Sequence, residues 1–332
     1  MTHNHNITFP AFSKEEYQSA KIHLATQVAH MMGRKFEEGD WGVVYCDAKN
    51  IPLGGWSNLN IDVNYRGLGV EHKLLRCRSL NGKPIKSVCG TTLMHPAATR
   101  SIRINDTSRD ANEVMRDVFH QYAELISIRT EKVRKAFPES EPDMRIGWLL
   151  WEASLTEFLY FEQPLVAPDS SEYYAQWNET PAKGSRKASK SLWIFERSTN
   201  KKRYSVTTSA GIKIQPYFDV PSPADSNLYY FRVQSEPIDA ETVQIWVAAS
   251  TARTIQRLLG SLEKDKVSDA IIKAAKDTVR SDVQPPEQQE LAQPIVLTKR
   301  AFEIFKEAWH GVSDEHSAQL FVESLHSVTS AG

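Results

Sequence analysis

Two short segments of alternating apolar and polar residues, joined by a glycine-containing turn, constrain the fold of this chain most. In residues 59–65, apolar side chains at every second position alternate with Asn60, Asp62 and Asn64, which is the pattern of a strand with one buried face. A second strand is predicted over 70–75, and the glycines between the two segments permit a tight reversal. The sequence therefore predicts a β-hairpin.

The register of this hairpin brings polar side chains together. If Arg66 and Gly67 form a two-residue turn, cross-strand partners have residue numbers that sum to 133, and Asp62 lies opposite Glu71. Their Cβ atoms would be about 5 Å apart. Because side chains alternate along a strand, Lys73 lies on the same face as Glu71.

These residue types point to metal-assisted hydrolysis of a phosphodiester. Two carboxylates placed opposite each other destabilise a sheet unless a cation lies between them. Mg²⁺ typically takes one or two protein carboxylates and completes its coordination with water and phosphate oxygens. A neighbouring lysine, here Lys73, orients or deprotonates the attacking water and offsets charge on the phosphorane. The sequence predicts Asp62, Glu71 and Lys73 as catalytic residues.

An alternative to this interpretation is that the motif has no catalytic role. An acid followed two residues later by lysine occurs often by chance, and Asp47-Ala-Lys49 is a second example in this chain. That copy has no alternating strand ahead of it and runs into Pro52, which breaks strands. For Glu71 and Lys73, the alternative is an exposed hairpin with a surface ion pair that contributes at most about 1 kcal/mol.

Periodicity predicts further elements in the first half of the chain. Ser13 and Glu16 form a capping box at the start of a helix that ends at Gly33, and Asp110 begins a second helix that ends before Pro138. Residues 41–45 form a possible strand, and residues 148–161, apolar nearly all round, are predicted as a buried helix.

The second half is predicted to be strand-rich and then helical. We expect three parts: residues 1–165 as the catalytic core, 166–250 as a strand-rich part for recognition, and 251–332 as a helical part that serves dimerisation. The predicted strands are 191–196, 203–208, 228–234 and 243–248; the predicted helices are 252–262, 268–280, 299–309 and 315–327, with a linker at 285–294.

Charge is unevenly distributed although the formal net charge is only -1. Residues 66–86 contain six basic residues against Glu71, and residues 183–203 contain eight against Glu196. Two such segments on a neutral chain suggest a face that binds a polyanion; the alternative is two solvated loops. The predicted phosphate contacts are Arg186, Lys187, Lys190, Lys201, Lys202 and Arg203.

Trp193 and Phe195 lie between these basic residues. They alternate with Leu192 and Ile194 in a segment that is apolar on both faces. We therefore assign them to the core in preference to base stacking.

Asp62 on one strand and Glu71-His-Lys73 on the next resemble the PD-(D/E)XK nuclease superfamily. The size and the basic second half are similar to type II restriction endonucleases. The resemblance covers about 15 residues of motif and the architecture of roughly residues 10–165. Ile61 stands where the family pattern has proline.

The resemblance implies an α/β (α+β) fold with a mixed central sheet flanked by helices. It also implies Mg²⁺ dependence, cleavage that leaves 5′-phosphates, and a homodimer. Asp62 and Glu71 would be the metal ligands, and Lys73 would activate water. Glu16 on the first helix is a possible additional acid, with helix capping as the alternative.

The sequence disfavours several other classes of protein. It contains no apolar run of the roughly 18 residues that a membrane helix needs, no zinc-site spacing of Cys and His, and no glycine-rich phosphate loop. The three widely spaced cysteines and the lack of a secretory pattern favour a reducing cytoplasm.

The expected function is sequence-specific cleavage of double-stranded DNA. The alternatives are a repair or modification-dependent nuclease of the same superfamily, and a DNA-binding protein without catalysis.

Overall fold

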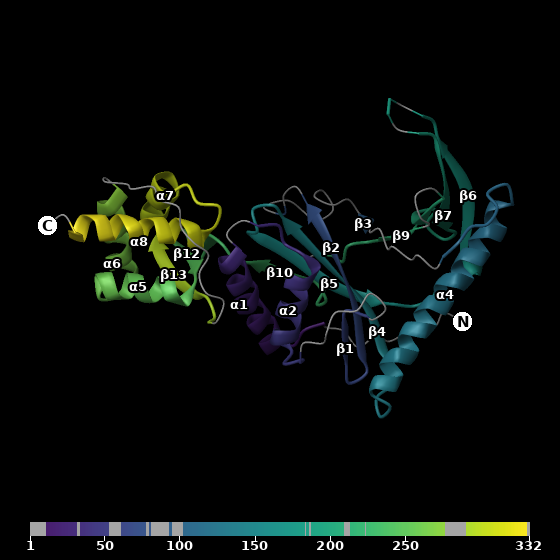
Figure 1. The fold of residues 1–332 in the computed structure, drawn as a ribbon, viewed down its shortest axis with the longest axis horizontal. Helices are drawn as coiled ribbons and strands as arrows, with labels where there is room; N and C mark the ends of the chain where they lie inside the picture. The colour runs from purple at the N-terminus through teal and green to yellow at the C-terminus, as the bar shows by residue number, and fades with distance from the viewer. Residues whose placement is uncertain are drawn as a thin grey trace.

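The computed structural model has three β-sheets with helices packed against them (Figure 1). A mixed five-stranded sheet lies in the middle, an antiparallel five-stranded sheet lies at one end, and a three-stranded sheet with four helices lies at the other. This confirms the mixed α+β class. The structure describes residues 11–31, 34–52, 61–77, 80, 93–94, 102–182, 184–185, 187–208, 213–222, 224–275 and 290–330.

The central sheet contains the predicted hairpin. Its strand order is β1-β2-β4-β5-β10, in which β2 and β4 are parallel and all other neighbours are antiparallel. The strands are β1 (Val63–Tyr65), β2 (Leu68–Cys77), β4 (Asp143–Glu152), β5 (Glu157–Pro164) and β10 (Tyr229–Arg232).

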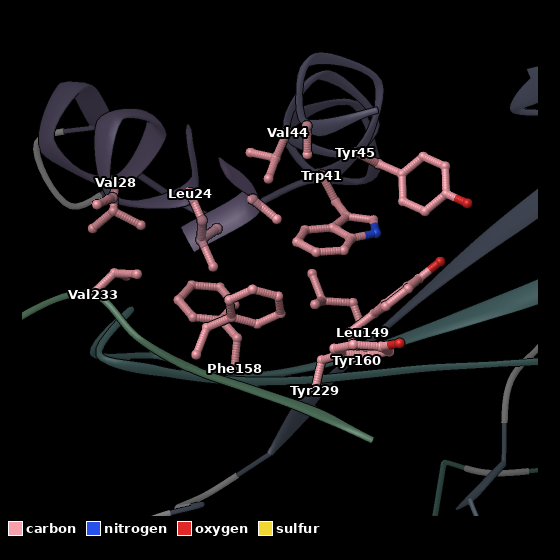
Figure 2. Close-up of a cluster of buried hydrophobic side chains, with 14 of the residues drawn as sticks. Leu24, Val28, Trp41, Val44, Tyr45, Leu149, Phe158, Tyr160, Tyr229 and Val233 are labelled. Carbon is pink, nitrogen blue, oxygen red and sulfur yellow. The ribbon is translucent and has the colours of Figure 1, made fainter. Parts of the chain in front are cut away.

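Two helices, α1 (Lys14–Met31) and α2 (Glu38–Ala48), cover one face of this sheet. The capping box predicted for α1 is present, since Ser13 N donates to Glu16 Oε2 and Glu16 N donates to Ser13 Oγ. Figure 2 shows side chains of both helices pointing toward the sheet, Leu24 toward Phe158 and Trp41 toward Tyr160. Burial of this aromatic-rich layer fixes α2 over β2 and β5.

The strand predicted at 41–45 is wrong, because these residues lie within α2. Trp41, Val44 and Tyr45 are buried at the three- and four-residue spacing of one helix face. Glu37 and Asp40 form a capping box at the helix start.

The helix predicted at 148–161 is also wrong. This segment forms most of the β4–β5 hairpin, whose turn includes Leu155 with φ 55°. Trp148 packs into the cluster on one face and Leu149 into the cluster on the other. A strand buried on both faces loses the polar alternation that identifies strands.

The second sheet is antiparallel in the order β3-β9-β8-β7-β6. It confirms the strands predicted at 191–196 and 203–208 and adds three that were not predicted. Its strands are β3 (Leu93–Met94), β6 (Tyr173–Thr180), β7 (Ser189–Glu196), β8 (Lys202–Thr207) and β9 (Lys213–Phe218), and the short helix η1 (Ser170–Glu172) precedes β6.

Helix α4 (Ala111–Ala136) connects the two large sheets. Asp110 caps it as predicted, and the helix ends before Pro138. Its N-terminal part packs on β6 and β7, and its C-terminal part lies against β1 and β2 (Figure 1). With 26 residues, α4 is about 39 Å long, so one rigid element reaches both sheets.

The C-terminal sheet contains β11 (Glu236–Pro237), β12 (Thr242–Val247) and β13 (Gln293–Thr298). The four helices predicted here are present with shifted bounds. They are α5 (Ala249–Leu259), α6 (Lys264–Ala274), α7 (Lys299–Ala308) and α8 (Asp314–Ser330).

The division of the chain into three parts remains a prediction. Strand pairing crosses the predicted boundary at residue 165. Strand β10 follows the second sheet in the chain but pairs with β5 in the central sheet. The first half of the predicted linker at 285–294 lies outside the described residues, and its last two residues begin β13. None of the described helices is long and apolar enough to cross a bilayer.

Candidate active site

The predicted register of the β1–β2 hairpin is confirmed. Val63 pairs with Val70 and Tyr65 pairs with Leu68. Arg66 and Gly67 have φ angles of 48° and 85°, the two positive values that a type I′ turn requires. Asp62, one residue before β1, therefore comes next to the strand at Glu71 and His72.

Asp62 is tied to the edge of β2. Its Oδ2 accepts a hydrogen bond of 2.7 Å from the backbone N of His72. This bond satisfies a strand N–H that β1, ending its pairing at Val63, does not reach. The carboxylate is thus held beside β2 by the backbone of the strand that also carries Glu71.

Glu71 and Lys73 form the centre of an ion-pair network. Lys73 Nζ lies 2.8 Å from Glu71 Oε1 and 3.5 Å from Glu38 Oε1, and Arg129 of α4 lies 3.2 Å from Glu71 Oε2. The side chains of Glu71 and Lys73 are only 14% and 13% exposed. An open surface pair would be far more exposed, so the network is a partly desolvated cluster at the meeting point of three elements.

Sequence reasoning missed two members of this cluster, Glu38 and Arg129. Glu38 is the first residue of α2, and the sequence predicts a strand at 41–45 in place of this helix. Arg129 lies on the predicted second helix, seventeen residues after Asn112 near its start. The sequence pattern of this helix does not indicate which strand the Arg129 side chain faces.

Glu16 is not brought to this cluster. Besides capping α1, its Oε2 lies 3.0 Å from Lys49 Nζ. The second acid-x-lysine pattern, Asp47-Ala-Lys49, lies at the end of α2 and not on a strand. Glu38, and not Glu16, is the helical acid beside Lys73.

The surroundings of Asp62 raise the proton affinity of its carboxylate. Desolvation and the charges of Glu71 and Glu38 raise the pKa of Asp62 to about 7. Because Asp62 is exposed to water, solvent screening reduces the energetic consequence of this shift. A carboxyl that titrates near neutral pH lies where a divalent cation or a proton is needed to balance charge.

Lys73 remains a cation in this setting. Burial lowers its pKa, but the carboxylates of Glu71 and Glu38 outweigh burial, and the net shift is upward. The amine therefore acts as a positive charge and hydrogen-bond donor in the free protein, and not as a base.

His72 points away from the cluster to the opposite face of β2. It is fully buried against the rings of Trp41 and Tyr45. Burial and the charge of Lys73 lower its pKa to about 3, so the ring is neutral. His72 packs α2 onto the sheet and takes no part in the polar cluster.

Two carboxylates of the cluster are the candidate ligands for a metal ion. Among the described residues, no group of three or more His, Cys, Asp and Glu side chains is arranged to hold one. Asp62 and Glu71 nevertheless offer two hard oxygen donors from neighbouring positions, and Mg²⁺ uses one or two protein carboxylates together with water and phosphate. The pair fits Mg²⁺ in number and in chemistry.

The predicted phosphate contacts gather around the second sheet, away from this cluster. Lys187 is exposed, and Lys190 donates to the carbonyl of Thr107. Lys201 and Arg203 both pair with Asp219. Arg186 lies outside the described residues.

Lys202 differs from these neighbours. Its Nζ lies 4.2 Å from the ring centre of Trp193 and 4.5 Å from that of Tyr217, and no carboxylate among the described residues pairs with it.

Comparisons with family models, with curated proteins and with solved structures returned no match for this chain.

Proposed function

We propose that this protein is a Mg²⁺-dependent endodeoxyribonuclease of the PD-(D/E)XK kind. The observation that carries the proposal is the convergence of Asp62 and Glu71 with Lys73 in one partly desolvated cluster. Structural ion pairs are usually balanced in charge. Among the described residues, Asp62, Glu71 and Glu38 face the two cations Lys73 and Arg129, and desolvation together with the charges of Glu71 and Glu38 raises the pKa of Asp62.

Asp62 and Glu71 would hold the metal ion, with Glu38 as a third acid at the helix N-terminus. When bound, Mg²⁺ supplies positive charge to the scissile phosphate and to the nucleophilic water. Lys73 donates a hydrogen bond to the phosphate or the water and offsets negative charge as it develops. Arg129 holds one oxygen of Glu71, which leaves that carboxylate in a fixed orientation.

The substrate that we propose is double-stranded DNA. We propose that the protein cleaves it at specific sequences, as a type II restriction enzyme does, in the cytoplasm. Support comes from the resemblance of the Asp62 and Glu71-His-Lys73 motif and from the basic segment at 183–203. Hydrolysis that leaves 5′-phosphates and a homodimer on a palindromic site follow from the same resemblance. A repair or modification-dependent nuclease would use the same catalytic residues.

One observation favours a second candidate, a DNA-binding protein without catalysis. Both oxygens of Glu71 already have cationic partners, Lys73 and Arg129. If this network only braces α4 against β2, the cluster is structural.

Incubation of plasmid or phage DNA with the protein, with and without Mg²⁺, separates these candidates. Discrete bands that require Mg²⁺ support a restriction enzyme, and a smear supports a less selective nuclease. No cutting together with a retained gel shift would overturn the nuclease proposal in favour of the binding protein.

A further inference from the structure

The second sheet presents a face that is not covered by α4. Leu192, Ile194 and Val206 point toward α4 and are completely buried. Because side chains alternate along a strand, Trp193 and Phe195 point the other way, and both are only partly buried. The prediction that β7 is buried on both faces is therefore wrong: only the face toward α4 is fully buried, and Trp193 and Phe195 lie outside that core.

Aromatic side chains and a lysine continue across four neighbouring strands on this side. Tyr174 of β6 pairs with Phe195 of β7, and their rings stack at 5.3 Å with an interplanar angle of 16°. Lys202 of β8 lies over Trp193 of β7 and Tyr217 of β9. We call these five residues, Tyr174, Trp193, Phe195, Lys202 and Tyr217, the aromatic face.

The segment that carries the aromatic face is rich in basic residues. Residues 173–218 contain nine basic residues against Glu179 and Glu196, in a chain whose net charge is only -1. Asp219, directly after β9, is already paired with Lys201 and Arg203. Lys202 and Arg197, which lies over Tyr174, border the rings on the solvent side.

We propose that the aromatic face binds an unpaired stretch of nucleic acid, with bases stacked on the rings and phosphates beside Lys202 and Arg197. Flat rings on a sheet reach the faces of bases only where the bases are not stacked in a duplex. The surrounding positive charge matches the phosphate backbone; a neutral sugar polymer would gain nothing from it.

Lys202 leaves room for such a ligand. Its contacts with the two rings are cation–π contacts at a partly exposed site, which are weaker than the stacking of a base on an aromatic ring. A base can therefore take the position over Trp193 while the flexible lysine moves to a phosphate. This binding goes beyond the proposed nuclease function, because it requires neither the acidic cluster nor a metal ion.

The test measures fluorescence anisotropy of a labelled oligothymidine of about 20 nucleotides with EDTA present, so that cutting does not enter. The variants are Trp193→Leu and Lys202→Gln. Matched controls are Tyr230→Leu, which removes a 44% exposed tyrosine from the central sheet, and Lys266→Gln, which removes an exposed lysine from α6. Circular dichroism melting verifies that each variant is folded.

We expect Trp193→Leu to weaken binding about fivefold or more, the loss that one stacked base implies. Lys202→Gln should weaken binding and reduce the slope of log affinity against log salt by about 0.7. Both controls should stay within about twofold of the wild type, as substitutions away from the binding face do.

Four results would overturn the proposal, and three of them concern the oligonucleotide and a neutral sugar. They are no binding of the oligonucleotide, equal binding by wild type and both variants, or tight binding of a neutral oligosaccharide that depends on Trp193. A duplex of the same length that binds more tightly and equally to wild type and Trp193→Leu would also reject it. Failure of DNA cutting with binding retained would reject only the nuclease proposal.

Discussion

The Asp62 carboxylate has both a structural and an electrostatic role in the site. It caps an N–H of β2, and the same group is crowded by Glu71 and Glu38. The hydrogen bond fixes its position, and the crowding makes its charge unfavourable. A carboxylate held in place at an electrostatic cost is a common feature of a functional site.

The choice between Glu38 and Glu16 as the third acid is tested by two matched substitutions. Glu38→Gln should lower the rate of Mg²⁺-dependent cleavage by about tenfold or more, because it removes a carboxylate beside Lys73. Glu16→Gln should leave the rate unchanged and cost at most about 1 kcal/mol of stability through the cap of α1. Single-turnover cleavage rates decide, and a larger loss of rate in Glu16→Gln would refute the assignment.

The raised pKa of Asp62 predicts a pH-dependent stability. In the unfolded chain this carboxyl titrates near pH 3.9, and in the fold near pH 7. The favourable contribution of the neutral form is complete below the lower value and is lost as pH rises through the upper one. In EDTA, Asp62→Asn should therefore melt at a higher temperature than wild type at about pH 8 and at a similar temperature at about pH 4.

Thermal melting across this pH range, with Asp47→Asn as the control, provides the measurement. A wild type that is more stable than Asp62→Asn at alkaline pH would show that Asp62 is stabilised as a carboxylate.

At the scale of elements, the β1–β2 hairpin depends on glycine at position 67 of its turn. Gly67 has φ 85°, and an added Cβ would lie 2.7 Å from the carbonyl oxygen of Glu141. Gly67→Ala should destabilise the fold by at least about 1–2 kcal/mol, the cost of a left-handed conformation with a side chain, and should also reduce cleavage through the position of Asp62.

Gly39→Ala is the matched control for this substitution. Gly39 lies in α2 with nothing within 4 Å of an added Cβ, so alanine should stabilise by about 0.5–1 kcal/mol. Urea unfolding measures both variants. Equal stability of Gly67→Ala and wild type would contradict the strained-turn account.

The sequence was sufficient for elements whose signals are local. The β1–β2 register followed from alternation and turn chemistry, and α1 and α4 followed from their caps. It was insufficient for β4 and β5, which are covered on both faces, and for β9, where Pro216 weakens a strand prediction. Asp62, Glu71 and Lys73 come from one hairpin, whereas Glu38 and Arg129 reach the cluster only through tertiary packing.

At the scale of the molecule, α4 makes the two large sheets depend on each other. Phe119 of α4 is buried in the core of the second sheet, while Arg129 of the same helix pairs with Glu71 of the central sheet. A rigid helix that contributes to both cores should couple their unfolding.

This coupling is tested with Phe119→Ala, expected to cost about 3–5 kcal/mol as a large-to-small core substitution. Ile128→Ala is the control, since Ile128 lies on the same helix and is 57% exposed. Urea unfolding followed by far-UV and near-UV circular dichroism should show one shifted transition for Phe119→Ala. Two separate transitions, with the second unchanged from wild type, would show that the sheets unfold independently.

We propose that Asp62, Glu71 and Lys73 together cut DNA. This proposal is tested most directly by the rate of Mg²⁺-dependent cleavage of phage DNA by wild type, Asp62→Asn and Asp47→Asn, with binding measured in parallel. We predict that Asp62→Asn cuts about a hundredfold or more slowly with DNA affinity within about tenfold of wild type, and that Asp47→Asn cuts at the wild-type rate. Equal cleavage by Asp62→Asn and wild type, or no Mg²⁺-dependent cleavage by the wild type, would contradict the account.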